Sequence, residues 1–395
     1  MRVLHVTPYF APAFAYGGPP RSIFELCRAL RHAGVDVRVV TTTANGATML
    51  PASGAAADVY DGVPVRYCRL ARPAWYFNAA VGAALDEDLR WCDVCHVHGV
   101  WNVPEWRATS RAARTGVPYV LSPRGMLEPR AVARGRWRKA MAYALVERRA
   151  LRDAALLHAT SAGEADTLRE LAPAAGIVTL PNGVDLEAAS RGPSGVFRRT
   201  AGIAAGEPLI VFLGRLHPIK RLDLLAAAFG RVRAALPPAR LVLAGRDEGG
   251  FRRTIEPLFA PFGAAVFWAG ELAPADKWAL LRDATVLVLC SDSESFGLSV
   301  AEALAAGVPA VVTRTCPWPD LDAWGCGSWV EQTPVAIGDA LTRILRDPGA
   351  AAAMGERGRT VARARFDWTA IAAAMASHYG EVAGRRAERR SRLAS

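Results

Sequence analysis

The stretch Ser291-Asp-Ser-Glu-Ser-Phe-Gly-Leu-Ser-Val-Ala-Glu-Ala-Leu304 carries the most specific information about the fold of this chain. The apolar run 285–290 before it reads as a buried strand, a short polar loop follows, and Gly297 opens a helix. Backbone N–H groups at a helix start have no intrahelical partner and bind anions. Three residues would present such groups here: Phe296, Gly297 and Leu298.

Two carboxylates accompany this predicted anion site. Glu294 lies at the loop tip, and Glu302 lies roughly one turn into the helix. They would repel a bare diphosphate, but they could accept hydrogen bonds from sugar hydroxyls that flank one. The alternative is an N-capped helix whose glutamates are incidental.

Strand and helix signals alternate on both sides of this stretch, which predicts an α/β fold of two Rossmann-like domains with parallel sheets. Strands are expected at 3–7, 35–41, 94–98, 119–122, 156–160 and 177–180, and then at 209–213, 240–244, 264–268, 285–290 and 309–312. The Gly, Pro and Ser residues at 190–195 indicate a linker. Ligands of such sheets bind beyond the carboxyl ends of the strands, so the site is expected in a cleft between the two domains.

The predicted boundaries follow from these signals. We expect an N-terminal domain at 1–188, a C-terminal domain at 189–366, a helix at 367–384 that returns to the first domain, and a basic tail at 385–395.

Composition narrows the function classes. No apolar run reaches the roughly 18 residues of a membrane-spanning helix, and the first residues do not resemble a signal peptide, so we expect a cytoplasmic protein. The net charge of +11 suits nucleic acid, phosphorylated metabolites or an anionic membrane, and it also suits an ordinary basic surface. No nucleic-acid-binding motif is present, and we expect no nucleic-acid partner. Cys92 and Cys95 have C-x-x-C spacing, which we interpret as buried apolar cysteines rather than a zinc or redox site.

Three motifs give the chain a family resemblance. Glu294 and Glu302, with seven residues between them, match the E-x7-E motif of the large retaining GT-B glycosyltransferase family, the group 1 or family 4-like transferases. Gly214-Arg215-Leu216-His-Pro-Ile-Lys220 matches its Gly-Arg-Leu…Lys motif, and Leu180-Pro-Asn-Gly-Val-Asp185 matches the end of its first domain. The resemblance covers the whole chain and is strongest over 180–312.

The resemblance implies roles for single residues. Arg215 and Lys220 would bind the donor diphosphate and stabilise its charge as it leaves, Glu294 would contact the donor sugar and Glu302 the ribose. The implied catalytic residues are His98, Arg215, Lys220 and Glu294, and the implied donor-binding residues are Gly17, Gly18, Phe296, Gly297, Leu298 and Glu302. No metal ligand and no cofactor are expected. Arg221 departs from the glycine of many relatives, which leaves open whether it also binds the diphosphate.

Two implied positions in the first domain have ordinary alternatives. His98, in Cys95-His-Val-His-Gly-Val-Trp101, matches a histidine that the family places near the transferred sugar, but it could equally be a satisfied histidine at a strand end. Gly17 and Gly18 match the glycine turn that approaches the diphosphate, and they also suit a plain helix-entry turn.

A basic region follows in the first domain. Arg124 and Arg130, in the stretch 122–130, are candidate acceptor-binding residues, and relatives with a similar Ser-Pro-Arg-Gly-Met-Leu stretch build bacterial surface polysaccharides. The run 134–152 combines arginines with Trp137, Met141 and Leu145. This pattern fits an interfacial helix or a phosphate-bearing acceptor site. It also fits a helix packed on its own domain, which is the interpretation we prefer.

The sequence therefore predicts a retaining hexosyltransferase. It would use a UDP- or GDP-sugar and a glycan acceptor, expected to be lipid-linked, in bacterial exopolysaccharide or lipopolysaccharide synthesis, with peripheral contact with the inner membrane surface. The alternatives are another GT-B enzyme, such as a nucleotide-sugar epimerase or a sugar phosphorylase, and more distantly a non-catalytic nucleic-acid binder.

Overall fold

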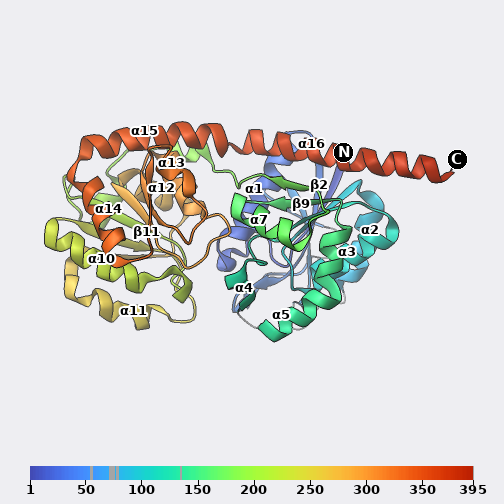
Figure 1. Cartoon of the computed structure of the whole chain (residues 1–395), viewed down its shortest axis with the longest axis horizontal. Coiled ribbons are helices and arrows are strands. Elements are labelled where there is room, and N and C mark those ends of the chain that lie inside the picture. Colours follow the sequence, from blue (N-terminus) through green and yellow to red (C-terminus); the bar gives the residue numbers. More distant parts are fainter. Residues whose placement is uncertain (54–56, 71–75, 77–79, 134–135, 395) are drawn as a thin grey trace. The chain divides into compact units, whose positions relative to one another are not determined.

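The chain divides into two compact α/β units (Figure 1). The computed structural model describes residues 1–53, 57–70, 76, 80–133 and 136–394, without the side chains of residues 130, 133, 136 and 386–394. Unit 1 comprises Met1–Gly183 and Trp368–Ser395, and unit 2 comprises Val184–Asp367. The first boundary lies five residues before the predicted one at 188. Val184 and Ala189 belong to a hydrophobic core of unit 2, and the Val184 N–H donates to Phe366 O, which explains the shift.

The described part of unit 1 is built on an eight-stranded sheet with the order β10-β9-β8-β7-β1-β2-β6-β5. Every neighbouring pair is parallel except β5 and β6. The strands are β1 Arg2–Val6, β2 Asp36–Thr42, β5 Asp58–Tyr60, β6 Val63–Cys68, β7 Val94–His98, β8 Tyr119–Ser122, β9 Leu156–Ala159 and β10 Ile177–Thr179, beside a small hairpin of β3 Ala44–Asn45 and β4 Thr48–Met49.

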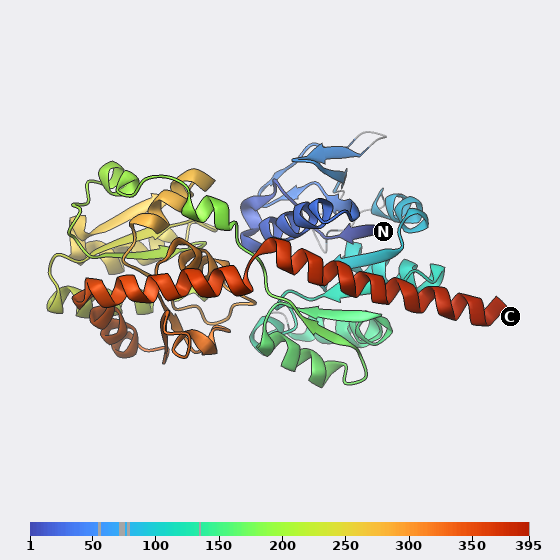
Figure 2. The same ribbon diagram turned by 90° about the horizontal axis from the view of Figure 1, so that it is seen from above.

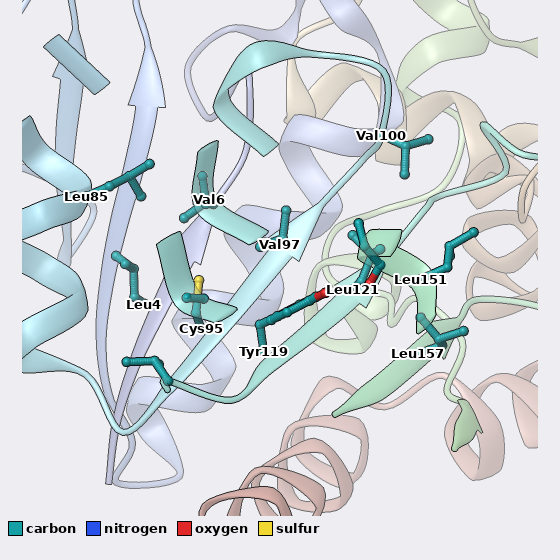
Figure 3. Close-up of a cluster of buried hydrophobic side chains, with 14 of the residues drawn as sticks. Leu4, Val6, Leu85, Cys95, Val97, Val100, Tyr119, Leu121, Leu151 and Leu157 are labelled. Carbon is teal, nitrogen blue, oxygen red and sulfur yellow. Dashed lines mark hydrogen bonds between the residues drawn. The ribbon is translucent and has the colours of Figure 1, made fainter. Parts of the chain in front are cut away.

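Helices cover both faces of this sheet (Figure 2). They are η1 Phe14–Tyr16, α1 Gly18–His32, α2 Ala80–Trp91, α3 Val103–Thr115, α4 Pro129–Ala133, α5 Arg136–Ala142, the π-helix η3 Tyr143–Glu147, α6 Arg148–Asp153, α7 Ala162–Leu171 and α16 Trp368–Ala394. Side chains alternate across a strand, so Leu4 and Val6 enter one core while Val3 enters the other. Figure 3 shows the first of these cores, where Tyr119 and Leu121 lie among residues of α2, α6 and the neighbouring strands.

Helix α16 belongs to the second core of unit 1. It contacts α1, and it buries Ala372, Met375, Tyr379 and Val382. This is the helix expected at 367–384. Helical backbone continues past residue 384 into the segment expected as a basic tail and ends at Ala394.

Unit 2 contains a six-stranded, fully parallel sheet with the order β13-β12-β11-β14-β15-β16. The strands are β11 Leu209–Leu213, β12 Arg240–Ala244, β13 Val266–Gly270, β14 Val286–Leu289, β15 Ala310–Thr313 and β16 Gly327–Val330. The helices are α8 Leu186–Ser190, α9 Val196–Ala201, η4 Pro218–Lys220, α10 Leu222–Ala235, α11 Arg252–Phe259, η5 Ala260–Ala265, α12 Pro274–Asp283, α13 Leu298–Ala306, η6 Pro319–Leu321, α14 Pro334–Arg346 and α15 Pro348–Arg365.

The predicted pair of Rossmann-like sheets is confirmed, and every predicted strand is present to within two residues at each end. Strands β3, β4 and β5, which are only two or three residues long, and strands β6 and β16 were not predicted. In β6 Pro64 interrupts the strand pattern, and β16 is only four residues long, so neither gives a clear apolar run.

Candidate functional site

In unit 2 the predicted donor residues lie on two loops that follow neighbouring strands. Strands β11 and β14 pair directly, so the loops after them meet at the carboxyl edge of the sheet. The Asp292 N–H donates to Ile219 O at 2.7 Å and links the two loops. This adjacency brings Lys220 and Glu294 together although they are 74 residues apart.

Lys220 and Glu294 form an almost buried ion pair. The Lys220 ammonium donates to Glu294 Oε1, and Ser291 Oγ donates to the same oxygen at 2.7 Å. The side chains are only 13% and 14% exposed, so solvent screens their attraction weakly. Lys220 thus contacts the carboxylate that is expected to bind the donor sugar.

Gly297 shapes the start of α13. Its φ of +84° is the left-handed region, and a Cβ there would meet Leu289 and Trp318 at 3.2 and 3.1 Å. Trp318 Nε1 donates to Phe296 O and holds the turn, while no side chain caps the helix at Gly297. Leu298 is the first helical residue. This turn has the backbone form expected of an anion-binding helix start.

Glu302 has a partner that sequence reasoning missed. Lys277 Nζ, on α12, donates to Glu302 Oε1 at 2.5 Å, and both side chains are nearly buried. The same ammonium lies 4.4 Å from the centre of the Trp278 ring. No motif marks Lys277, because its relation to Glu302 depends on how α12 packs beside α13. If Glu302 binds the ribose as expected, its carboxylate would therefore contact both the ribose and the Lys277 ammonium.

Arg215 is likewise held by a carboxylate. Its guanidinium donates to Glu248, which lies in the loop after β12, and the two side chains are 35% and 42% exposed. Glu248 was not predicted, because it comes from a different loop. Arg215 and Lys220 are both paired with acids here, so a bound diphosphate would have to compete for them.

Arg221 serves a different purpose from its neighbour Lys220. Its φ is +51°, a left-handed conformation that glycine adopts more easily. Its guanidinium makes two bonds to Asp223, at 3.0 and 2.9 Å, and one to Asp292 at 3.1 Å. These bonds raise the pKa of Arg221 further above its ordinary value. The side chain therefore ties the two loops of the candidate donor site together.

In unit 1, His98 lies at the end of β7 inside a buried histidine network. It is 1% exposed, and its Nδ1 accepts from Arg124 Nη2 at 3.1 Å. Burial lowers the pKa of His98 well below its ordinary value, so the ring is neutral. Its Nε2 must then carry the proton and donate to His5 Nδ1 at 2.9 Å. Both ring nitrogens of His98 are therefore engaged within the network, which agrees with the alternative of a satisfied histidine at a strand end.

Arg124 is the most unusual charge in unit 1. It is buried, its φ is +58°, and burial lowers its pKa to about 10, so it stays protonated at neutral pH. Its hydrogen-bond partners are Ser22 Oγ, Asn182 Oδ1 and the neutral His98, at 3.3, 2.8 and 3.1 Å. Its Nε is buried without a partner among the described atoms. The buried carboxylate of Glu164 lies near enough to raise the pKa of Arg124 and so offsets part of the effect of burial, but the hydrogen-bond partners themselves are neutral. A buried cation with neutral hydrogen-bond partners favours an anionic ligand nearby.

The glycine turn lies close to this cation. Gly17, at φ +81°, ends η1 and is the N-cap of α1, and Gly18 is the first helical residue. Ser22, in the next turn of α1, contacts Arg124. The amino end of α1 and a buried guanidinium thus add positive potential at the same place. The side chain of Arg130, the other predicted acceptor residue, lies outside the described residues.

An aromatic cluster near the glycine turn was not predicted. The rings of Tyr9 and Tyr16 stack with centroids 4.2 Å apart, and Tyr76 meets them edge-on at 6.1 and 6.3 Å. All three are partly exposed. Tyr9 and Tyr16 lie in the one connection between β1 and α1, but Tyr76 comes from a distant part of the chain, so no spacing in the sequence could have indicated the whole cluster.

Two groups of potential metal ligands, a histidine cluster and the C-x-x-C cysteines, have features that do not favour metal binding. His5, His96 and His98 have ring nitrogens within 4.8 Å of one another, but His96 already bonds to Tyr379 and Ser122, and the Arg124 guanidinium touches His98. A cation in this place opposes a metal ion. All seven cysteines are free and buried, which agrees with the apolar interpretation of Cys92 and Cys95.

The histidine network predicts sensitivity to acid. Burial lowers the pKa of His5 and of His158 to about 3, so between pH 6.5 and 3 the unfolded chain binds protons that the folded chain does not. Stability is then lost as the pH falls through this window, by about 1.4 kcal/mol per pH unit for each histidine. Glu105 has the opposite effect, because burial raises its pKa to about 8 and the folded state keeps its proton.

A single substitution isolates the histidine contribution. His158→Gln removes one titrating group, so its unfolding free energy in urea should fall less than that of the wild type between pH 6.5 and 5, by about 2 kcal/mol. The exposed His32 provides the matched variant His32→Gln, which should follow the wild type. Equal pH dependence of wild type and His158→Gln would contradict the prediction.

Comparison with known proteins identifies a family for both units. The family profile described as Glycosyl transferases group 1 matches residues 195–361, and the Glycosyl transferase 4-like domain matches residues 17–183. The D-inositol 3-phosphate glycosyltransferase 2 of Catenulispora acidiphila is 30% identical over 407 residues, which cover 95% of this chain and 93% of that protein.

Two further similarities extend the comparison. The GDP-mannose:cellobiosyl-diphosphopolyprenol alpha-mannosyltransferase of Komagataeibacter xylinus is 27% identical, over 98% of this chain and 94% of its own. The structure of sucrose-phosphate synthase from Thermosynechococcus elongatus matches with a TM-score of 0.77 at 22% identity, covering 96% of this chain and 98% of that one. At that identity the structural match shows the fold, a GT-B fold, and nothing about substrates.

Proposed function

We propose a donor and an acceptor for this chain. The chain belongs to the glycosyl transferase group 1 family and is a retaining hexosyltransferase that uses a nucleotide sugar. In this proposal it moves a hexose from a UDP- or GDP-sugar to a glycan linked to a lipid diphosphate, in the synthesis of a bacterial exopolysaccharide or lipopolysaccharide. The buried guanidinium of Arg124, held by neutral groups, is the observation that carries the acceptor assignment.

The donor half of the reaction is assigned to unit 2. As the sugar bond breaks, the departing nucleoside diphosphate gains negative charge, which Lys220 and Arg215 would stabilise. The first N–H groups of α13 would add to this stabilisation. Glu294 would accept hydrogen bonds from sugar hydroxyls while Lys220, which it already contacts, turns toward the diphosphate.

We also propose that this reaction needs no divalent metal. The chain has two D-x-D spacings, 86–88 and 320–322, and three of their four aspartates have structural partners. Asp86 pairs with Arg111, the buried Asp88 pairs with Arg38 and Arg66, and Asp322 accepts the Trp329 N–H. Acids engaged in this way are poor candidates for a metal site, which supports charge neutralisation by Lys220 and Arg215 instead.

The acceptor half is assigned to unit 1. Arg124 and the amino end of α1 place positive potential beside the Gly17 turn, where a phosphate on the acceptor would be attracted. The partly exposed tyrosine cluster lies at the same edge of the sheet. The names of the two relatives described above refer to an inositol phosphate and to a diphosphopolyprenol, both of which carry phosphate.

A transfer assay with purified enzyme tests the proposal. Each UDP- and GDP-hexose is paired with a polyprenyl-diphosphate sugar and, separately, with the same sugar on an uncharged lipid, in excess EDTA. We expect transfer to the diphosphate acceptor to be at least tenfold faster, and to be unchanged by the chelator. Arg124→Gln should raise KM for the diphosphate acceptor about tenfold, while Arg124→Lys retains part of the affinity.

Three outcomes would contradict the proposal. Equal rates with charged and uncharged acceptors would show that Arg124 does not recognise a phosphate group of the acceptor. Activity lost in EDTA and restored by magnesium or manganese would refute metal independence. Conversion of the donor with no acceptor present would indicate an epimerase.

A further inference from the structure

A ridge of large apolar side chains is exposed on unit 1. Residues 136–153 form a continuous helical segment of α5, η3 and α6. Trp137, Met141 and Leu145, spaced four residues apart, are 84%, 63% and 79% exposed. We call these three residues the apolar ridge. The segment packs on its own domain, as the preferred interpretation from sequence has it, but these three apolar side chains do not take part in that packing.

The face of the segment that does pack is a different one. Ala142, Ala150 and Leu151 are buried in the core, and Glu147 is buried and accepts hydrogen bonds from the Trp101 N–H and from Trp106 Nε1. The segment is thus fixed to unit 1 through one face, while the ridge on another face stays exposed in the described part of the chain. Exposed apolar patches of this kind mark interaction surfaces.

A basic groove adjoins the ridge. A cavity of about 700 Å³ lies between α3 and the η3–α6 part of the segment. Its lining includes Arg107, Arg111, Arg114 and Arg149, which we call the arginine groove. Among the described residues that line the groove, Asp153 is the one acid, and it pairs with Arg149. Leu145 lines the groove too, so the groove and the ridge form one surface.

Positive charges outnumber negative charges around this surface. Arg149 and Arg152 are 76% and 69% exposed and share the single carboxylate of Asp153. Arg114 is exposed at the end of α3, and Arg138 is exposed beside Trp137. Apolar side chains bordered by arginines are typical of elements that lie in a lipid–water interface, where the apolar groups enter the acyl boundary and the cations meet phosphate.

We propose that the apolar ridge and the arginine groove form a docking surface for an anionic phospholipid membrane. Phosphate groups of the lipid bind in the groove, and Trp137, Met141 and Leu145 enter the acyl boundary. No described helix is long and apolar enough to cross a membrane. The proposal deepens the proposed function, because it brings the enzyme to the surface that holds a lipid-linked acceptor.

Vesicle co-sedimentation of the full-length protein, without donor or acceptor, tests the docking surface. The vesicles are phosphatidylcholine alone, or phosphatidylcholine with 30% phosphatidylglycerol. We expect binding to the anionic vesicles at 50 mM NaCl that weakens at least tenfold at 500 mM, and little binding to the neutral ones. Arg114→Gln and Arg149→Gln should each weaken binding about fivefold, and Trp137→Ser and Leu145→Ser about tenfold each.

Matched variants elsewhere serve as controls. Arg169→Gln changes an exposed helical arginine of unit 1 that pairs with Asp166, and Leu258→Ser changes an exposed leucine of unit 2. Both should bind vesicles like the wild type. Absent binding at 50 mM NaCl, equal binding to neutral vesicles, or equal losses in the controls would overturn the proposal. A dimer in solution that Trp137→Ser dissociates would overturn it too, by identifying a second copy as the occupant.

A separate measurement distinguishes this proposal from the proposed function. Trp137→Ser and Arg149→Gln should transfer sugar to a detergent-dispersed short-chain acceptor at the wild-type rate, and be at least fivefold slower with the acceptor in anionic vesicles. If every variant and the wild type lack transfer but vesicle binding follows the expected pattern, only the proposed substrates are wrong.

Discussion

Replacing Lys220 by alanine is expected to lower kcat about a thousandfold. Lys220 is the almost buried cation that faces the candidate donor site, and a transition state that accumulates charge on a diphosphate loses most when such a cation is removed. Steady-state kinetics with the best donor of the panel measure the loss. Lys220→Arg should recover part of it, because the charge remains while the compact ammonium is lost.

The same substitution leaves Glu294 with Ser291 as its remaining side-chain donor, so the unfolding free energy should fall by about 1–3 kcal/mol. The double variant Lys220→Met with Glu294→Gln removes both charges and should regain stability without regaining activity. Arg221→Gly provides a matched control in the same loop. It relieves a left-handed backbone at the cost of bonds to Asp223 and Asp292, and it should keep turnover within about fivefold. A Lys220→Ala enzyme with near-normal kcat would refute the assignment.

Glu294→Gln is expected to lower kcat about a hundredfold in a folded protein. The amide keeps the shape of the side chain and can still accept from Ser291, but it no longer offers a charged acceptor to the sugar hydroxyls. The variant also frees Lys220 from its carboxylate. Binding of the nucleoside diphosphate without sugar should therefore be as tight as in the wild type or tighter, as titration calorimetry would measure.

This pair of measurements separates two explanations. If Glu294 contacts the sugar, turnover falls while affinity for the nucleoside diphosphate is kept. If Glu294 only positions Lys220, both turnover and that affinity fall together. Near-normal turnover of a folded Glu294→Gln enzyme would show that neither role is important.

The local structure of the candidate donor site could be predicted because its signals are local. Gly297 marks a left-handed turn before a helix, and Lys220 and Glu294 each follow an apolar run that reads as a buried strand. The direction of a strand and the turn after it depend on neighbouring residues, so a few residues indicate both. The alternation of strand and helix likewise predicted two parallel sheets, and the chain has them.

The partners of those residues could not be predicted. Lys220 contacts Glu294 only because β11 lies next to β14, and Lys277 reaches Glu302 only because α12 packs beside α13. The partners are 74 and 25 residues apart, and charge pattern alone does not say which distant acid a cation meets.

The sequence by itself determined the fold class, the family and the loops to which the donor chemistry is assigned in the proposal, because strand periodicity, turn glycines and motif spacing are properties of short segments. Only the tertiary structure decided which face of a segment meets solvent. It buried Arg124 among neutral partners and engaged both nitrogens of His98, and it left Trp137 exposed where an amphipathic pattern fits a packed helix equally well. Burial is set by what packs against a side chain, and for these residues the neighbours come from distant parts of the chain.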